Sequence, residues 1–245
     1  TYIVGLIGVN DAVKFLTGVE FHESEEALRL GEKLVAHMFL RCKKLSLKHK
    51  MKLTLEESPA ESAARRLAKA DLVYYREEAL QTYKGGSEDV AYYTNSIHLA
   101  PEADVSLVRR IREQSKFHSL IESGAIIHAF VGEEKPSAES IARLVTETFF
   151  ETQAAQLTIS PEFTHCYACS QSCRGLLETC PSCGSDKVVG ETRVVGNFSK
   201  IQNWNKSKRE GELKARQKGL YAVEAGAAPA EAAAPAEAEL EAVEA

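Results

Sequence analysis

Four cysteines in two closely spaced pairs are the residues of this chain best suited to chemistry. Cys166 and Cys169 form the first pair, and Cys180 and Cys183 follow after ten intervening residues. Each CxxC pair can place two thiolates on one ion from a tight turn, and Gly184 supplies the backbone freedom that such turns need. Four thiolates suit tetrahedral Zn²⁺ and leave no open position for a substrate. The spacing therefore predicts a structural zinc site, with iron as the minority alternative.

The two remaining cysteines are not expected to be ligands. Cys173 lies between the two pairs and is interpreted as a bystander, and Cys42 falls on the apolar face of an expected helix, where a buried packing cysteine is the simpler interpretation. Six cysteines could also form disulfides. Two CxxC pairs favour a metal site in a reducing compartment instead, so we expect a cytoplasmic protein.

A polar group in the middle of the chain offers a candidate substrate-binding site. Tyr93, Asn95, Ser96 and His98 lie on an expected strand, with Tyr93 and Asn95 on one face and Ser96 and His98 on the other. Polar side chains at the end of a barrel strand often point at a substrate. A hydrogen-bonded network within the core explains the same pattern equally well.

Acidic and histidine side chains give weaker signals. Glu56, Glu57 and Glu61 could form a carboxylate cluster for acid–base catalysis. The simpler interpretation is that Glu57 and Glu61 complement the N-terminus of a helix that opens at Pro59. His128 is flanked by apolar residues, so a hydrogen-bonded core histidine is expected there.

Strands and helices alternate over residues 1–160, which favours an α/β architecture. Helices are expected over residues 24–50 with Ser24 as the cap, 105–121, 137–150 with Ser137 as the cap, and 206–218, with a further helix opening at Pro59. Strands are expected over residues 52–56, 91–97, 125–131 and 155–159.

Composition and charge restrict the possible partners. The 245 residues are 44% hydrophobic and carry a net charge of −5, which does not suggest a general nucleic-acid binder. No apolar run approaches the length of a membrane span. Residues 187–218 nevertheless carry nine Lys or Arg against three Glu. The alanine-, proline- and glutamate-rich tail over 221–245 is expected to be disordered.

Several phrases of the sequence resemble, in the same order, the C-terminal end of anaerobic (class III) ribonucleotide reductases, a glycyl radical enzyme family. The resemblance covers about residues 1–220, and its phrases lie at 3–13, 55–61, 92–98, 128–133, 166–183 and 193–204. In that family a glycine corresponding to Gly196 carries a stable backbone radical. The chain departs from the family pattern at Asn197, where a tyrosine is common, and at Ser123, where many members have glycine.

A glycine suits this chemistry for a physical reason. A radical at Cα is stabilised by the amide nitrogen on one side and the carbonyl on the other, and a side chain would twist that system and block an activating enzyme. Without the resemblance, Gly196 would be interpreted as an ordinary turn residue.

The resemblance implies a fold and a division of the chain. It implies the C-terminal part of a ten-stranded α/β barrel over 1–160, a four-cysteine zinc knuckle over 161–188, and the radical loop with a C-terminal helix over 189–220. The chain opens without Met on an expected strand, and the family's thiyl cysteine lies upstream of residues 3–13. We therefore expect a fragment that is inactive alone.

The resemblance also implies an activity and partners. Members reduce ribonucleoside triphosphates to 2′-deoxyribonucleoside triphosphates by glycyl and thiyl radical chemistry, with formate or a small redox protein as reductant. A radical-SAM activating enzyme generates the glycyl radical, and the full-length protein is expected to be a homodimer that engages neither membrane nor nucleic acid. The alternative hypothesis is a zinc-ribbon module that binds nucleic acid through residues 187–218, with Phe198 and Trp204 as stacking surfaces.

Overall fold

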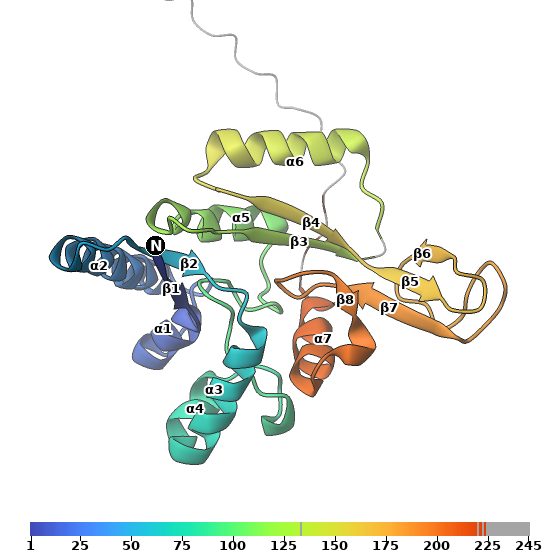
Figure 1. The fold of residues 1–245 in the computed structure, drawn as a ribbon, viewed down its shortest axis with the longest axis horizontal. Coiled ribbons are helices and arrows are strands. Elements are labelled where there is room, and N and C mark those ends of the chain that lie inside the picture. Colours follow the sequence, from blue (N-terminus) through green and yellow to red (C-terminus); the bar gives the residue numbers. More distant parts are fainter. Residues whose placement is uncertain (133, 220, 222, 224–245) are drawn as a thin grey trace, which may run out of the picture.

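Parallel strands alternate with helices in the first part of the chain, and a small antiparallel sheet with a short C-terminal helix follows (Figure 1). The computed structural model describes residues 1–132, 134–219, 221 and 223. The helices are α1 (Val9–Thr17), α2 (Glu25–His49), α3 (Glu61–Tyr74), α4 (Arg76–Thr82), α5 (Leu107–Ser115), α6 (Ala138–Glu151) and α7 (Leu213–Arg216). The strands are β1 (Tyr2–Leu6), β2 (Leu53–Glu57), β3 (Ile127–Gly132), β4 (Leu157–Pro161), β5 (Phe163–Cys166), β6 (Ser172–Arg174), β7 (Val188–Thr192) and β8 (Ser199–Lys200). The expected mixed α/β class is confirmed.

Two parallel strand pairs form the framework of the first part. β1 pairs with β2, and β3 pairs with β4. Backbone hydrogen bonds link the pairs, because the Ser123 N–H donates to the Leu55 carbonyl and the Glu57 N–H donates to the Gly124 carbonyl, each at 2.9 Å. The segment that enters β3 therefore runs beside β2. The described residues otherwise contain only the four-stranded antiparallel sheet β6-β5-β7-β8, so the expected ten-stranded barrel is not confirmed.

The longest helix, α2, forms where its sequence pattern predicted it. The Ser24 side chain caps its N-terminus by accepting a hydrogen bond from the Ala27 N–H at 3.4 Å. Its apolar face joins the main core against β1 and β2. At Gly31 the helix lies so close to the Phe21 ring that a Cβ would collide with it.

Helices α5 and α6 cover one face of the β3–β4 pair. Ile127 and Ala129 of β3 pack there with Leu107 of α5 and Leu144 of α6. Because successive strand residues point to opposite faces, His128 and Phe130 point away from these helices, toward the C-terminal part of the chain. α6 is capped by Ser137, whose side chain accepts from the Ser140 N–H at 3.1 Å, as predicted.

The strand predicted over residues 91–97 is wrong. The segment makes only the isolated bridges Ile7 with Asn95 and Lys84 with Tyr92. The buried carboxylate of Asp11 accepts the Thr94 N–H at 2.7 Å, which removes that donor from any sheet, and Ser96 adopts a left-handed backbone with φ of 46°. The two-face alternation inferred for the four polar residues of this segment is wrong for the same reason.

Several predicted helix boundaries also shift. α3 begins at Glu61, so Pro59 precedes its cap instead of lying in its first turn. The helix predicted over 105–121 ends at Ser115 and is followed by a 3₁₀ turn, and the one predicted over 206–218 is a π-helical turn, Ser207–Glu212, that leads into α7.

Most of the tail predicted to be disordered lies outside the described residues. Tyr221 and Val223 are exceptions: the Tyr221 ring is buried against Phe130 at 5.3 Å between centroids, and Val223 packs against the same apolar cluster. Across the part of the chain that is described, no helix has the length and apolar character needed to cross a membrane.

Candidate functional site

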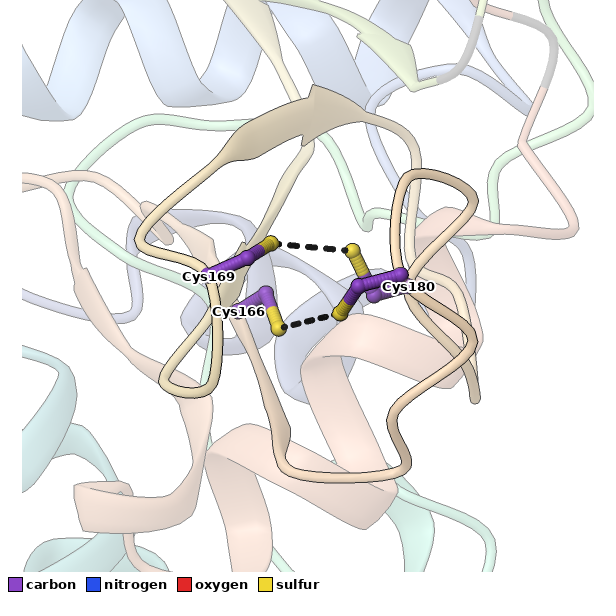
Figure 2. A group of neighbouring side chains, drawn as sticks. Cys166, Cys169 and Cys180 are labelled. Atoms are coloured by element: carbon purple, nitrogen blue, oxygen red, sulfur yellow. Dashed lines mark hydrogen bonds between the residues drawn. The ribbon is translucent and has the colours of Figure 1, made fainter.

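The four cysteines of the two CxxC pairs converge on one point beside the antiparallel sheet, as Figure 2 shows for the three that it labels. Their sulfur atoms all lie within 4.8 Å of one another. The Sγ atoms of Cys166 and Cys183 are 3.7 Å apart, and those of Cys169 and Cys180 are 3.6 Å apart. Four thiolates at about 2.3 Å around a tetrahedral Zn²⁺ would stand about 3.8 Å apart. The donor set and its spacing therefore fit a zinc ion.

The two halves of the cluster are built the same way. The Ser170 N–H donates to the Cys166 carbonyl at 2.9 Å, and the Gly184 N–H donates to the Cys180 carbonyl at 2.8 Å. Both turns end in a left-handed residue, Ser170 with φ of 59° and Gly184 with φ of 72°. Backbone hydrogen bonds from Cys183, and secondarily Ser182, lower the pKa of the Cys180 thiol, which favours the thiolate that binds metal.

The remaining cysteines lie apart from the cluster. The Cys173 thiol contacts the Thr164 carbonyl at 3.5 Å, and Cys42 is buried in the main core, where burial raises its thiol pKa. All six cysteines are free thiols.

The loop that contains Gly196 starts where β7 ends and leads into β8. Gly196 does not adopt a left-handed backbone, unlike Gly184 and seven other glycines of the described residues. A Cβ placed on Gly196 would lie 3.9 Å from its nearest neighbours, Glu61 Oε1 and Pro59 Cβ, which is an ordinary contact distance. Neither backbone conformation nor packing therefore requires glycine at this position.

Side chains from distant segments hold the loop. The Val195 N–H donates to Glu61 Oε1 at 3.4 Å, and the Lys208 ammonium lies 3.5 Å from Glu61 Oε2. Val194 packs in a small apolar cluster with Trp204 and Leu213. The sequence placed Glu61 at a helix N-terminus or in a catalytic carboxylate cluster. Neither interpretation predicted its contact with the loop, which joins residues 134 positions apart.

A cavity of about 50 Å³ lies behind the loop, against Val194 and Val195. Of the four residues predicted to bind substrate, Asn95 and His98 line this cavity, whereas Tyr93 lines a separate groove between α1, α3 and α4. The Tyr93 hydroxyl donates to Asp71 at 2.9 Å. Ser96 is buried and lines neither space. The structure thus brings two of the four to the loop.

His98 belongs to a second polar group. Its Nε2 lies 3.2 Å from both Glu57 Oε2 and the Ile126 carbonyl, while the Ile126 N–H donates to the same Glu57 oxygen at 2.8 Å. His118 Nε2 approaches the other Glu57 oxygen at 3.5 Å, and its Nδ1 accepts the Ala155 N–H at 2.9 Å. Glu57 therefore ties β2 to the start of β3, and does not complement the α3 N-terminus.

The sequence missed the buried groups that line the cavity. The expectation of a hydrogen-bonded His128 is wrong, because neither ring nitrogen has a hydrogen-bond partner among the described residues. Burial lowers the pKa of His128 to about 3. The Glu212 carboxyl is likewise buried without a hydrogen-bond partner in this part of the chain, and burial, reinforced by nearby Glu61, raises its pKa to about 8. The apolar neighbours of His128 indicated its burial, but nothing in the local sequence indicates that its ring is unpaired or that Glu212 is buried.

Many of the basic side chains in residues 187–218 form contacts within the protein, either with carboxylates or with aromatic rings. Arg216 pairs with Glu162 at 2.7 Å, Lys206 with Asp89 at 2.7 Å, and Lys208 with Glu61. The Arg193 guanidinium stacks over the Phe198 ring at 4.3 Å, and the Lys200 ammonium lies 4.9 Å from the centre of the Tyr167 ring. These contacts weaken the hypothesis of a nucleic-acid-binding ribbon.

Comparisons with known proteins agree on one family. The family model described as anaerobic ribonucleoside-triphosphate reductase matches residues 1–218. A solved structure described as an anaerobic ribonucleotide reductase aligns with a TM-score of 0.73 and 23% identity over 89% of this chain and 34% of its own. The Thermotoga maritima enzyme in complex with dATP and CTP aligns with a TM-score of 0.69 and 21% identity over 86% of this chain and 33% of its own.

These alignments establish a shared fold, and the chain spans about a third of the length of the solved relatives. No curated protein matches the sequence.

Proposed function

Because this chain belongs to the anaerobic ribonucleoside-triphosphate reductase family, we propose that it contributes the radical-bearing part of an enzyme that reduces ribonucleoside triphosphates to their 2′-deoxy products. The proposed radical site is Gly196. The proposed partners are a radical-SAM activating enzyme, the nucleotide substrates and a second copy of the full-length protein.

The observation that carries this proposal is the environment of Gly196. A glycine kept for structural reasons has a left-handed backbone or a neighbour too close for a side chain, and Gly196 has neither. The loop has room for alanine, so a chemical requirement is the simplest reason for glycine there. A Cα hydrogen that can be removed to leave a planar, delocalised radical is such a requirement.

The cysteine cluster has a supporting role in this proposal. Cys166 ends β5, and β5 pairs with β7, the strand that leads directly into the Gly196 loop. Zn²⁺ held by Cys166, Cys169, Cys180 and Cys183 would fix the end of this sheet and offer no open coordination position. We propose the same division of the chain as the sequence analysis: a partial barrel over 1–160, a zinc knuckle over 161–188, and the radical loop with a helix over 189–220.

The radical chemistry requires a thiol partner. The activating enzyme removes one hydrogen atom from Gly196 Cα, and the resulting radical takes the hydrogen atom of a cysteine thiol, which leaves a thiyl radical and restores the glycine. Cys42 does not suit this step, because it is buried in the main core on α2. We propose that a cysteine outside this chain supplies the thiol, and that formate or a small redox protein supplies the electrons.

Asn95 and His98 are the proposed substrate-facing residues, since they line the cavity next to Val195. The cavity itself is too small for a nucleotide, because ligand pockets usually enclose about 300 Å³ or more. We therefore propose that substrate reaches Asn95 and His98 after the loop moves and enlarges this cavity.

Electron paramagnetic resonance on the zinc-loaded, full-length protein tests the radical site. The protein is incubated without oxygen with its activating enzyme and S-adenosylmethionine, beside Gly196→Ala and Asn197→Ala variants. We expect a glycyl doublet in wild type and Asn197→Ala, none in Gly196→Ala, and chain scission at residue 196 when oxygen is admitted. A doublet that persists in Gly196→Ala would place the radical elsewhere. No doublet in wild type, despite cleavage of S-adenosylmethionine, would overturn the proposal.

A further inference from the structure

Lys208 contacts Glu61 beside the Gly196 loop, and the proposed chemistry gives this contact no role. Lys208 lies in the π-helical turn Ser207–Glu212. Such turns are rare and occur often at functional sites, because the wider turn redirects side chains. The Lys208 N–H donates to Asn205 Oδ1 at 3.1 Å, which holds the start of the turn in place.

Two contacts press this turn against the segment that contains Tyr92. The Ser207 hydroxyl donates to the Ala91 carbonyl at 3.2 Å. A Cβ on Gly211 would stand only 3.0 Å from the Tyr92 ring and 3.1 Å from the Val90 carbonyl oxygen, so glycine allows the close approach. The backbone position of Lys208 is therefore fixed from both ends of the turn.

The Lys208 side chain reaches the loop through one carboxylate. Its ammonium lies 3.5 Å from Glu61 Oε2, and the other oxygen of Glu61 accepts the Val195 N–H at 3.4 Å. The side chains of Lys208 and Glu61 are 20% and 11% exposed, so water screens the pair only partly. Glu61 Oε1 also lies on the side of Gly196 from which a side chain would project.

The described residues offer Glu61 no other ion-pair partner than Lys208. Without a cation, a mostly buried carboxylate turns toward water, and this change weakens its acceptance of the Val195 N–H. The carboxyl of Glu212 is the second acidic group near Lys208, and its raised pKa reduces its competition for the ammonium at neutral pH.

We propose that Lys208 is a positioning residue for Gly196: by orienting the Glu61 carboxylate, it holds Val195 and with it the α-carbon of Gly196. The description of Gly196 as the reacting residue rests on the proposed function. The effect of Lys208 on the position of the loop is independent of the proposed function, because the contacts exist before any radical is formed.

Hydrogen exchange in the zinc-loaded, full-length protein before activation tests this hold directly. Lys208→Met keeps the length of the side chain and removes the charge, Lys208→Arg keeps the charge, and Lys206→Met removes a neighbouring charge that pairs with Asp89 instead. We expect exchange at residues 193–198 to be about 2- to 5-fold faster in Lys208→Met, since this corresponds to the loss of one partly screened ion pair. Lys208→Arg and Lys206→Met are expected to match wild type.

Electron paramagnetic resonance after activation is the second readout. We expect a weaker or broadened doublet in Lys208→Met and recovery in Lys208→Arg. Wild-type exchange in Lys208→Met, or equal acceleration in Lys206→Met, would overturn the role of Lys208. If no protein forms a radical but exchange still depends on Lys208, the radical proposal fails and the positioning role stands. If Lys208→Met does not fold, Glu61→Gln serves instead and is expected to accelerate exchange in the same segment.

Discussion

Arg216 and Glu162 form a buried ion pair, with 2.7 Å between the guanidinium and the carboxylate. Glu162 lies between β4 and β5, and Arg216 is the last residue of α7, so the pair joins the parallel strands to the C-terminal helix. The same guanidinium donates to the Arg193 carbonyl at the start of the Gly196 loop and stacks 4.3 Å over the Phe130 ring.

Removing one member of this pair is expected to be costly. Arg216→Met leaves the Glu162 carboxylate buried without its cation, and we expect a loss of about 3–5 kcal/mol in the free energy of unfolding. The double variant Arg216→Met, Glu162→Leu is expected to lose less than Arg216→Met alone, because no charge is left unpaired. Urea denaturation of the three proteins measures both values, and a double variant less stable than the single one would contradict the argument.

The buried carboxyl of Glu212 predicts a stability that falls as the pH rises. Its pKa is raised to about 8 in the folded protein from 4.5 in its reference state, so between these values the folded state holds a proton that the unfolded state has lost. Stability therefore declines over this range by at most about 1.4 kcal/mol per pH unit. Glu212→Gln lacks this decline. Urea titrations from pH 6.5 to 8 are expected to separate the two proteins progressively, and parallel profiles would count against a buried protonated Glu212.

His128 predicts the opposite dependence at lower pH. Burial lowers its pKa to about 3 from 6.5, so between these values the unfolded state binds a proton that the folded state rejects, and stability falls as the pH falls. Glu212 has the opposite effect between pH 4.5 and 6.5, so the measurement is made in the Glu212→Gln background. We expect the double variant Glu212→Gln, His128→Phe to lose less free energy of unfolding on acidification than Glu212→Gln alone. Equal losses would show that His128 gains a proton without unfolding.

The cysteine cluster predicts a metal dependence that one matched pair of variants can isolate. Cys180→Ser removes a proposed ligand, whereas Cys173→Ser changes a half-buried thiol that lies outside the cluster and contacts the Thr164 carbonyl. We expect about one zinc ion per chain in wild type and Cys173→Ser. In Cys180→Ser we expect the zinc to be lost and the melting temperature to drop by about 5 °C or more, since structural zinc contributes directly to folding. Metal analysis and thermal unfolding check both, and iron in place of zinc would correct the metal assignment.

The features that the sequence predicted correctly depend on local spacing. Ser24 and the apolar repeat behind it specify α2, and two CxxC pairs are sufficient to specify the cysteine cluster. Both patterns operate within a few turns of chain, where side-chain direction follows from backbone geometry.

The features that the sequence missed depend on partners far along the chain. Thr94 does not enter a strand because Asp11, 83 positions earlier, takes its N–H. Val195 meets Glu61 across 134 positions. The apolar neighbours of His128 correctly predicted its burial, but they gave no information about the cavity that leaves the ring unpaired.

A comparison of Gly31 and Gly196 tests whether a glycine is required for packing or for chemistry. Gly31 lies against the Phe21 ring, so Gly31→Ala overpacks the core and is expected to cost about 1–3 kcal/mol. Gly196→Ala meets no close neighbour and no left-handed backbone, so we expect unchanged stability or a gain of about 0.4–1 kcal/mol from a less flexible unfolded chain. Chemical denaturation compares the two. If Gly196→Ala proved the more damaging, glycine would be required there for structural reasons, and the environment of Gly196 would no longer support a radical at this position.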